Sequence, residues 1–355
     1  MIKNFNVWPS ELFPGVKEFL CDAIQNDTII MPHRSQEFSN LYSEIEKHFS
    51  DFFEIPEDYR LFFTYSATDG MDIIINALES EDITHVTNWF FWDLFINGSK
   101  AWKKNIKIKS WENQKRYDLN NIQWSEDVLI ITANDTSTGF EYNNEELKKV
   151  RKNNTSSKVI IDATSSFWAL KYDISLANAW ILSVQKNIWL PSGLGILIVH
   201  NSLIDESHKK AKKWKYIWWH NSLVKLESFY QKYHTPATPN TLLISWVWFI
   251  SQQYKTIFWS IEALDIFTKQ KAEYFYKEIQ KIDWLDVYNK GAGKSQTTFV
   301  LSITEEKLNK VNKVFEEHCY TASPGLFELT GKVIRIANFP VHSMNDIQEL
   351  IKLLK

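Results

Sequence analysis

Two charged residues and one hydroxyl-rich segment stand where apolar strands of the sequence are expected to end. Asp162 closes one apolar run, and Lys186 follows the next run by two residues. Both are unusual there, because carboxylates and amines are rarely buried without a partner. After an earlier apolar run, residues 66–70 (Ser-Ala-Thr-Asp-Gly) open a helical stretch. The free N–H groups and the dipole of such a helix start can bind an anion.

Together these features fit the chemistry of a pyridoxal-phosphate site. A partly desolvated lysine such as Lys186 can form a Schiff base. A carboxylate such as Asp162 can keep a pyridine nitrogen protonated, so that the ring accepts electrons, and the helix start can hold the phosphate. The plainer alternative is a structural ion pair of Asp162 and Lys186 beside ordinary helix caps, since Ser, Thr and Asp are common at that position.

The elements that must position these residues alternate between strand and helix. Amphipathic stretches such as 36–53 predict helices, and short apolar runs between them predict strands. The expected strands are 61–66, 83–87, 128–133, 157–162, 179–184 and 193–199. This alternation predicts a mostly parallel sheet flanked by helices on both faces. Ligands of such sheets bind at the carboxyl ends of the strands, where the polar turn 134–139 also lies.

The pattern changes in the last third of the chain. Residues 241–282 have a mostly helical pattern. After them we expect strands and helices in alternation, at 297–304, 305–318, 332–338 and 343–354. The sequence therefore predicts an α/β protein with a large cofactor-binding domain over 16–255. A small α+β domain would cover 256–355 together with the N-terminal segment 1–15.

The composition is that of an ordinary globular protein. The 355 residues include 40 Lys and Arg against 43 Asp and Glu. The resulting net charge of −3 gives no general attraction to nucleic acid or to an anionic membrane. The apolar runs are too short to cross a bilayer, and the N-terminus lacks a secretory signal. Two cysteines without metal-ligand spacing indicate a reducing compartment, so we expect a cytoplasmic protein without a metal site.

Six segments in order along the chain resemble the class V aminotransferases, pyridoxal-phosphate enzymes of fold type I. The most distinctive segment is Asp162-Ala-Thr-Ser-Ser, followed by Ser183-Val-Gln-Lys-Asn and Gly193-Leu-Gly. The other five are His33-Arg34-Ser35, Ser66-Ala67-Thr68, Asn134-Asp135-Thr136, Thr235-Pro236-Ala237-Thr238-Pro239 and Arg335-Ile336-Ala337-Asn338. They span nearly the whole chain, and within the family they are closest to the phosphoserine aminotransferases.

The resemblance implies a role for each matching residue. Lys186 would form the Schiff base with pyridoxal 5′-phosphate and move the substrate proton, and Asp162 would pair with the pyridine nitrogen. Arg335 would bind the α-carboxylate of the substrate, while His33 and Arg34 would face its distal acidic group. The other cofactor contacts would come from Ser66, Ala67, Thr68, Thr136, Gln185, His234 and Thr235, with Phe91 or else Trp92 stacked on the ring.

The implied reaction is ping-pong transamination between a small amino acid and a 2-oxo acid. His234 and Thr235 would reach the cofactor of a neighbouring subunit, which implies a homodimer with shared active sites. Phosphoserine and 2-oxoglutarate are the favoured substrates, in serine biosynthesis. However, Glu328-Leu329 stand where phosphoserine aminotransferases have a His-Arg pair for the substrate phosphate. Another small amino acid, such as alanine or serine, is therefore the alternative.

Two other functions remain open on the sequence. Cys319 could be the nucleophile of a cysteine desulfurase with the same fold, although Gln185 stands where those enzymes usually have His. A packed thiol at a helix end is the simpler interpretation of Cys319. The basic and aromatic stretch 208–220 could bind single-stranded nucleic acid. The nearly neutral chain favours a solvated helix there instead.

Overall fold

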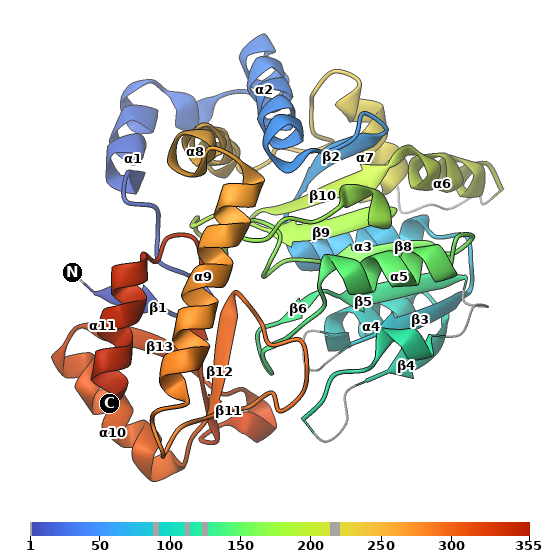
Figure 1. Cartoon of the computed structure of the whole chain (residues 1–355). Coiled ribbons are helices and arrows are strands. Elements are labelled where there is room, and N and C mark those ends of the chain that lie inside the picture. The colour runs from blue at the N-terminus through green and yellow to red at the C-terminus, as the bar shows by residue number, and fades with distance from the viewer. Residues whose placement is uncertain (1, 88–91, 111–113, 123–126, 214–220) are drawn as a thin grey trace.

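The chain has an α/β architecture built around two sheets (Figure 1). The structure is a computed structural model, and it describes residues 2–87, 92–110, 114–122, 127–213 and 221–355. A seven-stranded sheet forms the larger part of the molecule, and a five-stranded sheet forms the smaller part. The predicted mostly parallel sheet flanked by helices is confirmed.

The large sheet has the strand order β2-β10-β9-β8-β5-β3-β4. Only β10 runs antiparallel to its neighbours among these seven strands. The carboxyl ends of β5, β8 and β9 therefore meet at one edge of the sheet. The strands are β2 (Tyr59–Thr64), β3 (Asp82–Val86), β4 (Asn105–Lys109), β5 (Val128–Thr132), β8 (Lys158–Asp162), β9 (Ala179–Ser183) and β10 (Gly195–His200).

Helices cover both faces of this sheet. Figure 1 shows α5 in front of the sheet, with α3 and α4 behind it. The predicted helix over 36–53 is α2, whose apolar side is buried and whose first turn is capped by Ser35. The helices of this part are α1 (Val16–Gln25), α2 (Gln36–Phe53), α3 (Ala67–Ala77), α4 (Trp92–Ala101), α5 (Asn144–Asn153), α6 (Asn201–Lys213), α7 (Leu223–Tyr230) and α8 (Thr241–Phe258).

The small sheet joins the two ends of the chain. Its order is β1-β13-β14-β12-β11, with β1 (Lys3–Phe5) parallel to β13 (Tyr320–Pro324). Its apolar core is buried under three helices and includes the stacked rings of Phe275 and Phe299, whose centres are 3.9 Å apart. The remaining elements are β11 (Asp286–Val287), β12 (Thr298–Ser302), β14 (Val333–Ala337), α9 (Ile261–Ile279), α10 (Glu305–Glu317) and α11 (Met344–Leu354).

Two details bear on the sequence predictions. The proposed domain boundary near residue 255 falls inside α8, and the division into two domains stays a prediction. No helix in the described part of the chain is both long and apolar enough to cross a membrane. The short hairpin of β6 (Asn134–Asp135) and β7 (Phe140–Glu141) extends from the end of β5 toward the small sheet, as Figure 1 shows for β6.

Candidate active site

Lys186 and Asp162 lie together at the carboxyl edge of the large sheet. Asp162 is the last residue of β8, and Lys186 follows β9, the neighbouring strand. They are 5% and 6% exposed. Burial lowers the pKa of Lys186 to about 8, although the carboxylate of Asp162 opposes this. Burial also raises the pKa of Asp162, against a hydrogen bond from the Thr164 N–H at 3.0 Å and the charge of Lys186.

The backbone of Lys186 is held by the N-terminal segment. The Ser10 hydroxyl donates to the Lys186 carbonyl oxygen at 2.8 Å, and the Ser10 N–H donates to that of Gln185 at 3.1 Å. The half-buried Gln185 side chain accepts a hydrogen bond from Ser183. Nothing in the sequence pattern singled out Ser10, because its partners are 175 and more positions away.

Arg335 reaches the same site from the small sheet. It lies in the middle of β14 and is 1% exposed. Its Nε donates to the Pro324 carbonyl at 2.7 Å, and its Nη1 to the Thr136 carbonyl at 3.3 Å. No partner for Nη2 is found among the residues that the structure describes. Burial lowers the pKa of Arg335 to about 10, against the opposing charge of Asp135, so the guanidinium is charged at neutral pH and can bind a carboxylate.

Asp135 lies among these groups and was missed as a candidate. It is 2% exposed, and its charge acts on Lys186, Arg335 and Asp162. The polar turn 134–139 was visible in the sequence. The spacing of its residues alone does not tell which side chain points toward the lysine, because that depends on the geometry of the hairpin.

The start of α3 offers a second set of polar groups. The Ser66 hydroxyl accepts from the Asp69 N–H at 3.0 Å and caps the helix, which starts at Ala67 within the segment 66–70 that was expected to open it. The N–H groups of Ala67 and Thr68 have no partner in the described part of the chain. Gly195 of β10 lies directly beneath, and a Cβ there would be 2.4 Å from the Ser66 backbone. The helix start is therefore packed against β10 and open to an anion.

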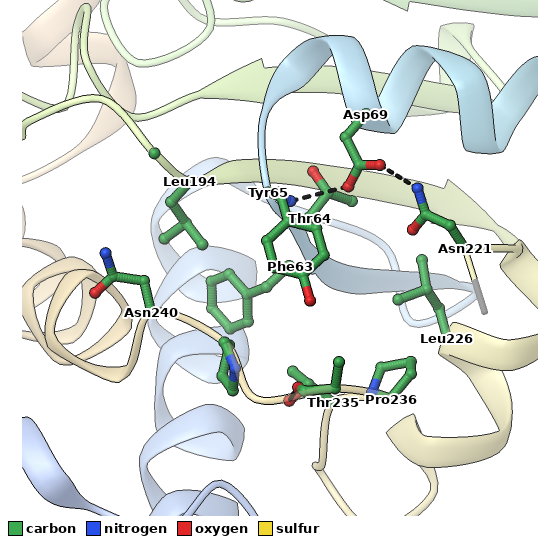
Figure 2. A pocket seen from close by; sticks show the side chains of 13 residues that line it. Phe63, Thr64, Tyr65, Asp69, Leu194, Asn221, Leu226, Thr235, Pro236 and Asn240 are labelled. Atoms are coloured by element: carbon green, nitrogen blue, oxygen red, sulfur yellow. Dashed lines mark hydrogen bonds between the residues drawn. The ribbon is translucent and has the colours of Figure 1, made fainter.

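A pocket lies beside this helix start (Figure 2). Figure 2 shows Asp69 accepting hydrogen bonds from the Tyr65 N–H, at 2.9 Å, and from the Asn221 side chain. Thr235, which is buried, borders the opposite side, and its hydroxyl donates to the Ala237 carbonyl at 2.8 Å. The segment that begins at Thr235 thus lines this pocket across from Asp69.

His33, Arg34 and His234 form a separate group. The His33 pKa is lowered by burial and by the charges of Arg34 and His234, and its buried Nε2 has no partner. Arg34 is exposed, with its guanidinium carbon 5.5 Å from the centre of the Phe229 ring. The charges that shift the pKa of Lys186 are those of Asp162, Arg335 and Asp135, which lie outside this group.

The residues around Lys186 fit pyridoxal phosphate. The hydroxyl of Thr136 is buried without a partner and can bind a polar group of the cofactor. The carboxyl of Asp162, the amine of Lys186 and the open N–H groups at the start of α3 supply the other contacts that this cofactor needs. The predicted stacking residue Phe91 lies outside the described residues. The alternative, Trp92, begins α4, but its side chain is not described.

Three residues outside the site bear on the desulfurase and nucleic-acid-binding alternatives. Cys319 is an exposed free thiol after α10, so the expectation of a packed thiol is wrong. Residues 208–213 belong to α6, where Lys210 donates to the Leu78 carbonyl at 2.9 Å and Lys213 pairs with Glu79. These two amines of the basic stretch therefore bind groups of their own chain, and 214–220 lie outside the described residues.

The chain is similar in sequence and in fold to known aminotransferases. A family model described as aminotransferase class V matches residues 9–321. The phosphoserine aminotransferase of Mannheimia succiniciproducens is 26% identical over 229 residues, which are 60% of this chain but only 62% of that enzyme. That of Buchnera aphidicola subsp. Acyrthosiphon pisum (strain Tuc7) is 24% identical, over 79% of this chain and 75% of the relative. The crystal structure of a Cytophaga hutchinsonii phosphoserine aminotransferase superposes with a TM-score of 0.93 at 24% identity, covering 99% of this chain and 98% of that one.

Proposed function

We propose a specific reaction for this chain, which belongs to the class V aminotransferase family and is a pyridoxal-phosphate-dependent transaminase. The proposed reaction moves the amino group between phosphoserine and 2-oxoglutarate. The observation that carries it is the convergence of Lys186, Asp162 and Arg335 in one buried site. When bound, pyridoxal phosphate supplies an aldehyde that condenses with amines and a ring that takes up electrons from the substrate carbon.

Each residue near Lys186 has one task in this proposal. Lys186 attaches the cofactor and moves the proton of the substrate α-carbon. Its pKa of about 8 supports this task, because part of the amine is neutral near physiological pH. Asp162 pairs with the pyridine nitrogen. Thr136 would bind the polar edge of the ring, and Gln185 and the start of α3, from Ser66 to Thr68, would hold the phosphate.

The substrate is held by two cationic groups. Arg335, whose Nε and Nη1 bind backbone carbonyls, would bind the α-carboxylate through Nη2. His33 and Arg34 bind the distal phosphate, from the partner subunit of a homodimer in which His234 and Thr235 also reach across to the neighbouring cofactor. The exposure of Arg34 supports this arrangement, because its charge is free to meet a second chain. The names of the curated relatives support phosphoserine as the donor. The cytoplasm is the proposed compartment, in line with the two free cysteines.

One observation favours a second candidate, a transaminase for alanine or serine. Leu329 packs in a small core with Tyr288, Val300 and Val333, and Glu328 is exposed beside it. The Leu329 side chain thus offers no donor to a phosphate, and the charge of Glu328 repels one. A small uncharged amino acid would meet no such repulsion.

An absorption titration distinguishes the two substrates. The near-visible band of the lysine-bound cofactor is followed while L-phosphoserine, L-alanine or L-serine is added, with D-phosphoserine as a control of equal charge. We expect L-phosphoserine to bleach the band at the lowest concentration. A band that responds only to alanine or serine would establish the second candidate. If no band forms after pyridoxal phosphate is added, the cofactor assignment is wrong.

A variant of Arg34 tests how the distal group is bound. In Arg34→Ala, kcat/KM for phosphoserine should fall about tenfold or more, because a charge-assisted hydrogen bond to the phosphate is lost. The value for alanine should change little. Equal losses for both substrates would contradict a phosphate contact of Arg34. Light scattering of the same samples tests the homodimer, which predicts twice the mass of one chain.

A further inference from the structure

Asp135 is a buried acid to which the proposed mechanism gives no task. It ends β6, and all of its acceptors serve one tight turn. Its Oδ1 accepts from the Ser137 N–H at 2.7 Å, and its Oδ2 from the Thr138 hydroxyl at 2.9 Å. Its carbonyl accepts from the Gly139 N–H at 2.9 Å, and Gly139 has a φ of +71°, which favours glycine. The carboxylate therefore fixes the conformation of residues 135–139.

This turn positions Thr136, whose carbonyl binds Arg335 and whose hydroxyl is available to the cofactor. The Thr136 carbonyl accepts from Arg335 Nη1 at 3.3 Å, while the Thr136 hydroxyl is buried without a partner. The second anchor of Arg335 is the Pro324 carbonyl, at 2.7 Å. A change in the turn would move one of the two recorded anchors of the guanidinium. The orientation of Arg335 thus depends on Asp135, although their side chains share no hydrogen bond in the described structure.

The charge of Asp135 also lies among the other charges of the site. It faces the cations of Lys186, after β9, and of Arg335, on β14. It also faces the carboxyl of Asp162, at the end of β8, and the phenol of Tyr288, after β11. Two buried cations near one another are costly without a compensating anion. The carboxyl of Asp162 acts on Lys186, and that of Asp135 acts on both cations.

We propose that Asp135 is a positioning residue of this site: its turn orients Arg335 through the Thr136 carbonyl, and its carboxylate is the counter-charge shared by Arg335 and Lys186. The inference rests on the proposed function, because that function gives Arg335 and Lys186 their tasks. It adds a residue that touches neither the cofactor nor the substrate. Its two contributions, the turn and the charge, can be separated by substitution.

Two variants separate the turn from the charge. In Asp135→Asn the amide oxygen can still accept from Ser137, and the amide nitrogen can donate to the Thr138 hydroxyl, so the turn is kept without the charge. Asp135→Ala removes both. Asp173→Asn is the matched control, because Asp173 closes a similar turn by accepting from the Ser175 N–H at 3.2 Å and hydroxyl at 2.6 Å. Asp173 is half-exposed, and its charge is not among those that shift the pKa values of Lys186 and Arg335.

The charge is tested on the cofactor-free protein. Competitive labelling with acetic anhydride over a range of pH, read by mass spectrometry of the peptide that contains Lys186, gives the pKa of this amine. We expect about 8 in the unaltered chain, a value lower by about one unit in Asp135→Asn, and no change in Asp173→Asn. An unchanged value in Asp135→Asn, or an equal shift in the control, would overturn the shared counter-charge. Because no cofactor takes part, this result is independent of whether the proposed reaction occurs.

The turn is tested by steady-state kinetics of the cofactor-loaded protein. Asp135→Ala should raise KM for the amino donor about tenfold with a smaller effect on kcat, since Arg335 loses a fixed anchor. Asp135→Asn should raise KM less than about threefold. Equal KM values in the two variants would overturn the positioning of Arg335.

If Asp135→Ala does not fold, the same comparison is made with Thr138→Val, which removes the hydroxyl that binds Oδ2. If the unaltered chain itself shows no transamination, the proposed function fails rather than this inference.

Discussion

Two buried lysines show that a lowered pKa alone does not identify a catalytic amine. Burial lowers the pKa of Lys186 to about 8 and that of Lys271 to about 7. Lys271 donates to the carbonyl oxygens of Phe339 at 2.9 Å and His342 at 2.8 Å, so it stabilises the loop after β14. Lys186 lies instead beside the carboxyl of Asp162 at the edge of the sheet. Its surroundings, rather than its pKa, make it the candidate.

Replacement of Lys186 by alanine should reduce turnover at least about a thousandfold, because the amine that attaches the cofactor and moves the proton is lost. The cofactor should still bind, which equilibrium dialysis would detect. Lys271→Met is the matched control: it removes another buried amine and should lower the melting temperature, since two carbonyls lose a donor. It should keep the cofactor band. Near-normal turnover of Lys186→Ala would remove Lys186 from the mechanism.

Arg335 gives the second prediction for a single residue. Arg335→Lys should cost about 2–3 kcal/mol in substrate binding, or roughly a hundredfold in kcat/KM, because lysine lacks the planar fork. The absorption spectrum of the bound cofactor should not change. Arg116→Lys is the control, since Arg116 makes a similar forked contact with Glu146 and a hydrogen bond to Ala292. An unchanged kcat/KM in Arg335→Lys would exclude the carboxylate contact.

At the scale of elements, the sequence predicted helix boundaries that are set by apolar spacing and capping. The bounds of α2 agree with the predicted helix 36–53, because its buried residues recur at helical spacing and Ser35 caps it. The start of α3 at Ala67 lies within the segment 66–70 that was expected to open a helix, although the small polar residues there carry no apolar pattern. Capping at Ser66 and packing against Gly195 decide that boundary instead.

Elements that depend on distant partners were not predicted. The strands β1 and β13 are short and partly exposed, and β1 pairs with β13 across nearly the whole length of the chain. Ser323 and Pro324 of β13 also pair with β14. In the same way, the motif residues Asp162 and Lys186 could be found in the sequence. Ser10 could not, because a hydrogen bond to a distant segment gives it its position. Asp135 could not either: its own hydrogen bonds are local, but its effect on Lys186 and Arg335 depends on how the hairpin places its turn.

The contact between α3 and β10 supports a prediction for the phosphate site. Gly195→Ala would place a Cβ 2.4 Å from the Ser66 backbone and from the Thr64 hydroxyl, so the start of α3 must move. We expect the Kd for pyridoxal phosphate to rise about tenfold or more, because the N–H groups at that start lose their alignment. Gly291→Ala is the control, since a Cβ there meets no atom closer than 3.4 Å. Equal cofactor affinities in the two variants, measured by absorption titration, would count against a phosphate at α3.

At the scale of the whole molecule, the N-terminal segment connects the two sheets. Its strand β1 extends the small sheet, and five residues later Ser10 binds the backbone of Lys186 at the edge of the large sheet. The loop after β14 fastens the same segment, because His342 Nε2 donates to the Asn4 carbonyl at 2.9 Å. The stability of the small sheet and the position of Lys186 are thus linked through residues 3–10.

This junction predicts how stability depends on pH. His342 is fully buried, and burial together with the charge of Lys271 lowers its pKa to about 3, from 6.5 in the unfolded chain. Its Nδ1 accepts from the Phe339 N–H and cannot take a proton without losing that bond. Between pH 6.5 and 3 the unfolded chain binds up to one more proton at this residue than the folded chain. The free energy of unfolding therefore falls as pH falls, by up to about 1.4 kcal/mol per pH unit.

The variant His342→Gln cannot bind this proton. The stability of the unaltered chain relative to His342→Gln, measured by urea unfolding, should therefore decline from pH 6.5 toward pH 4. The exposed His318→Gln should show no such trend, and a difference that stays constant with pH would contradict a neutral buried His342.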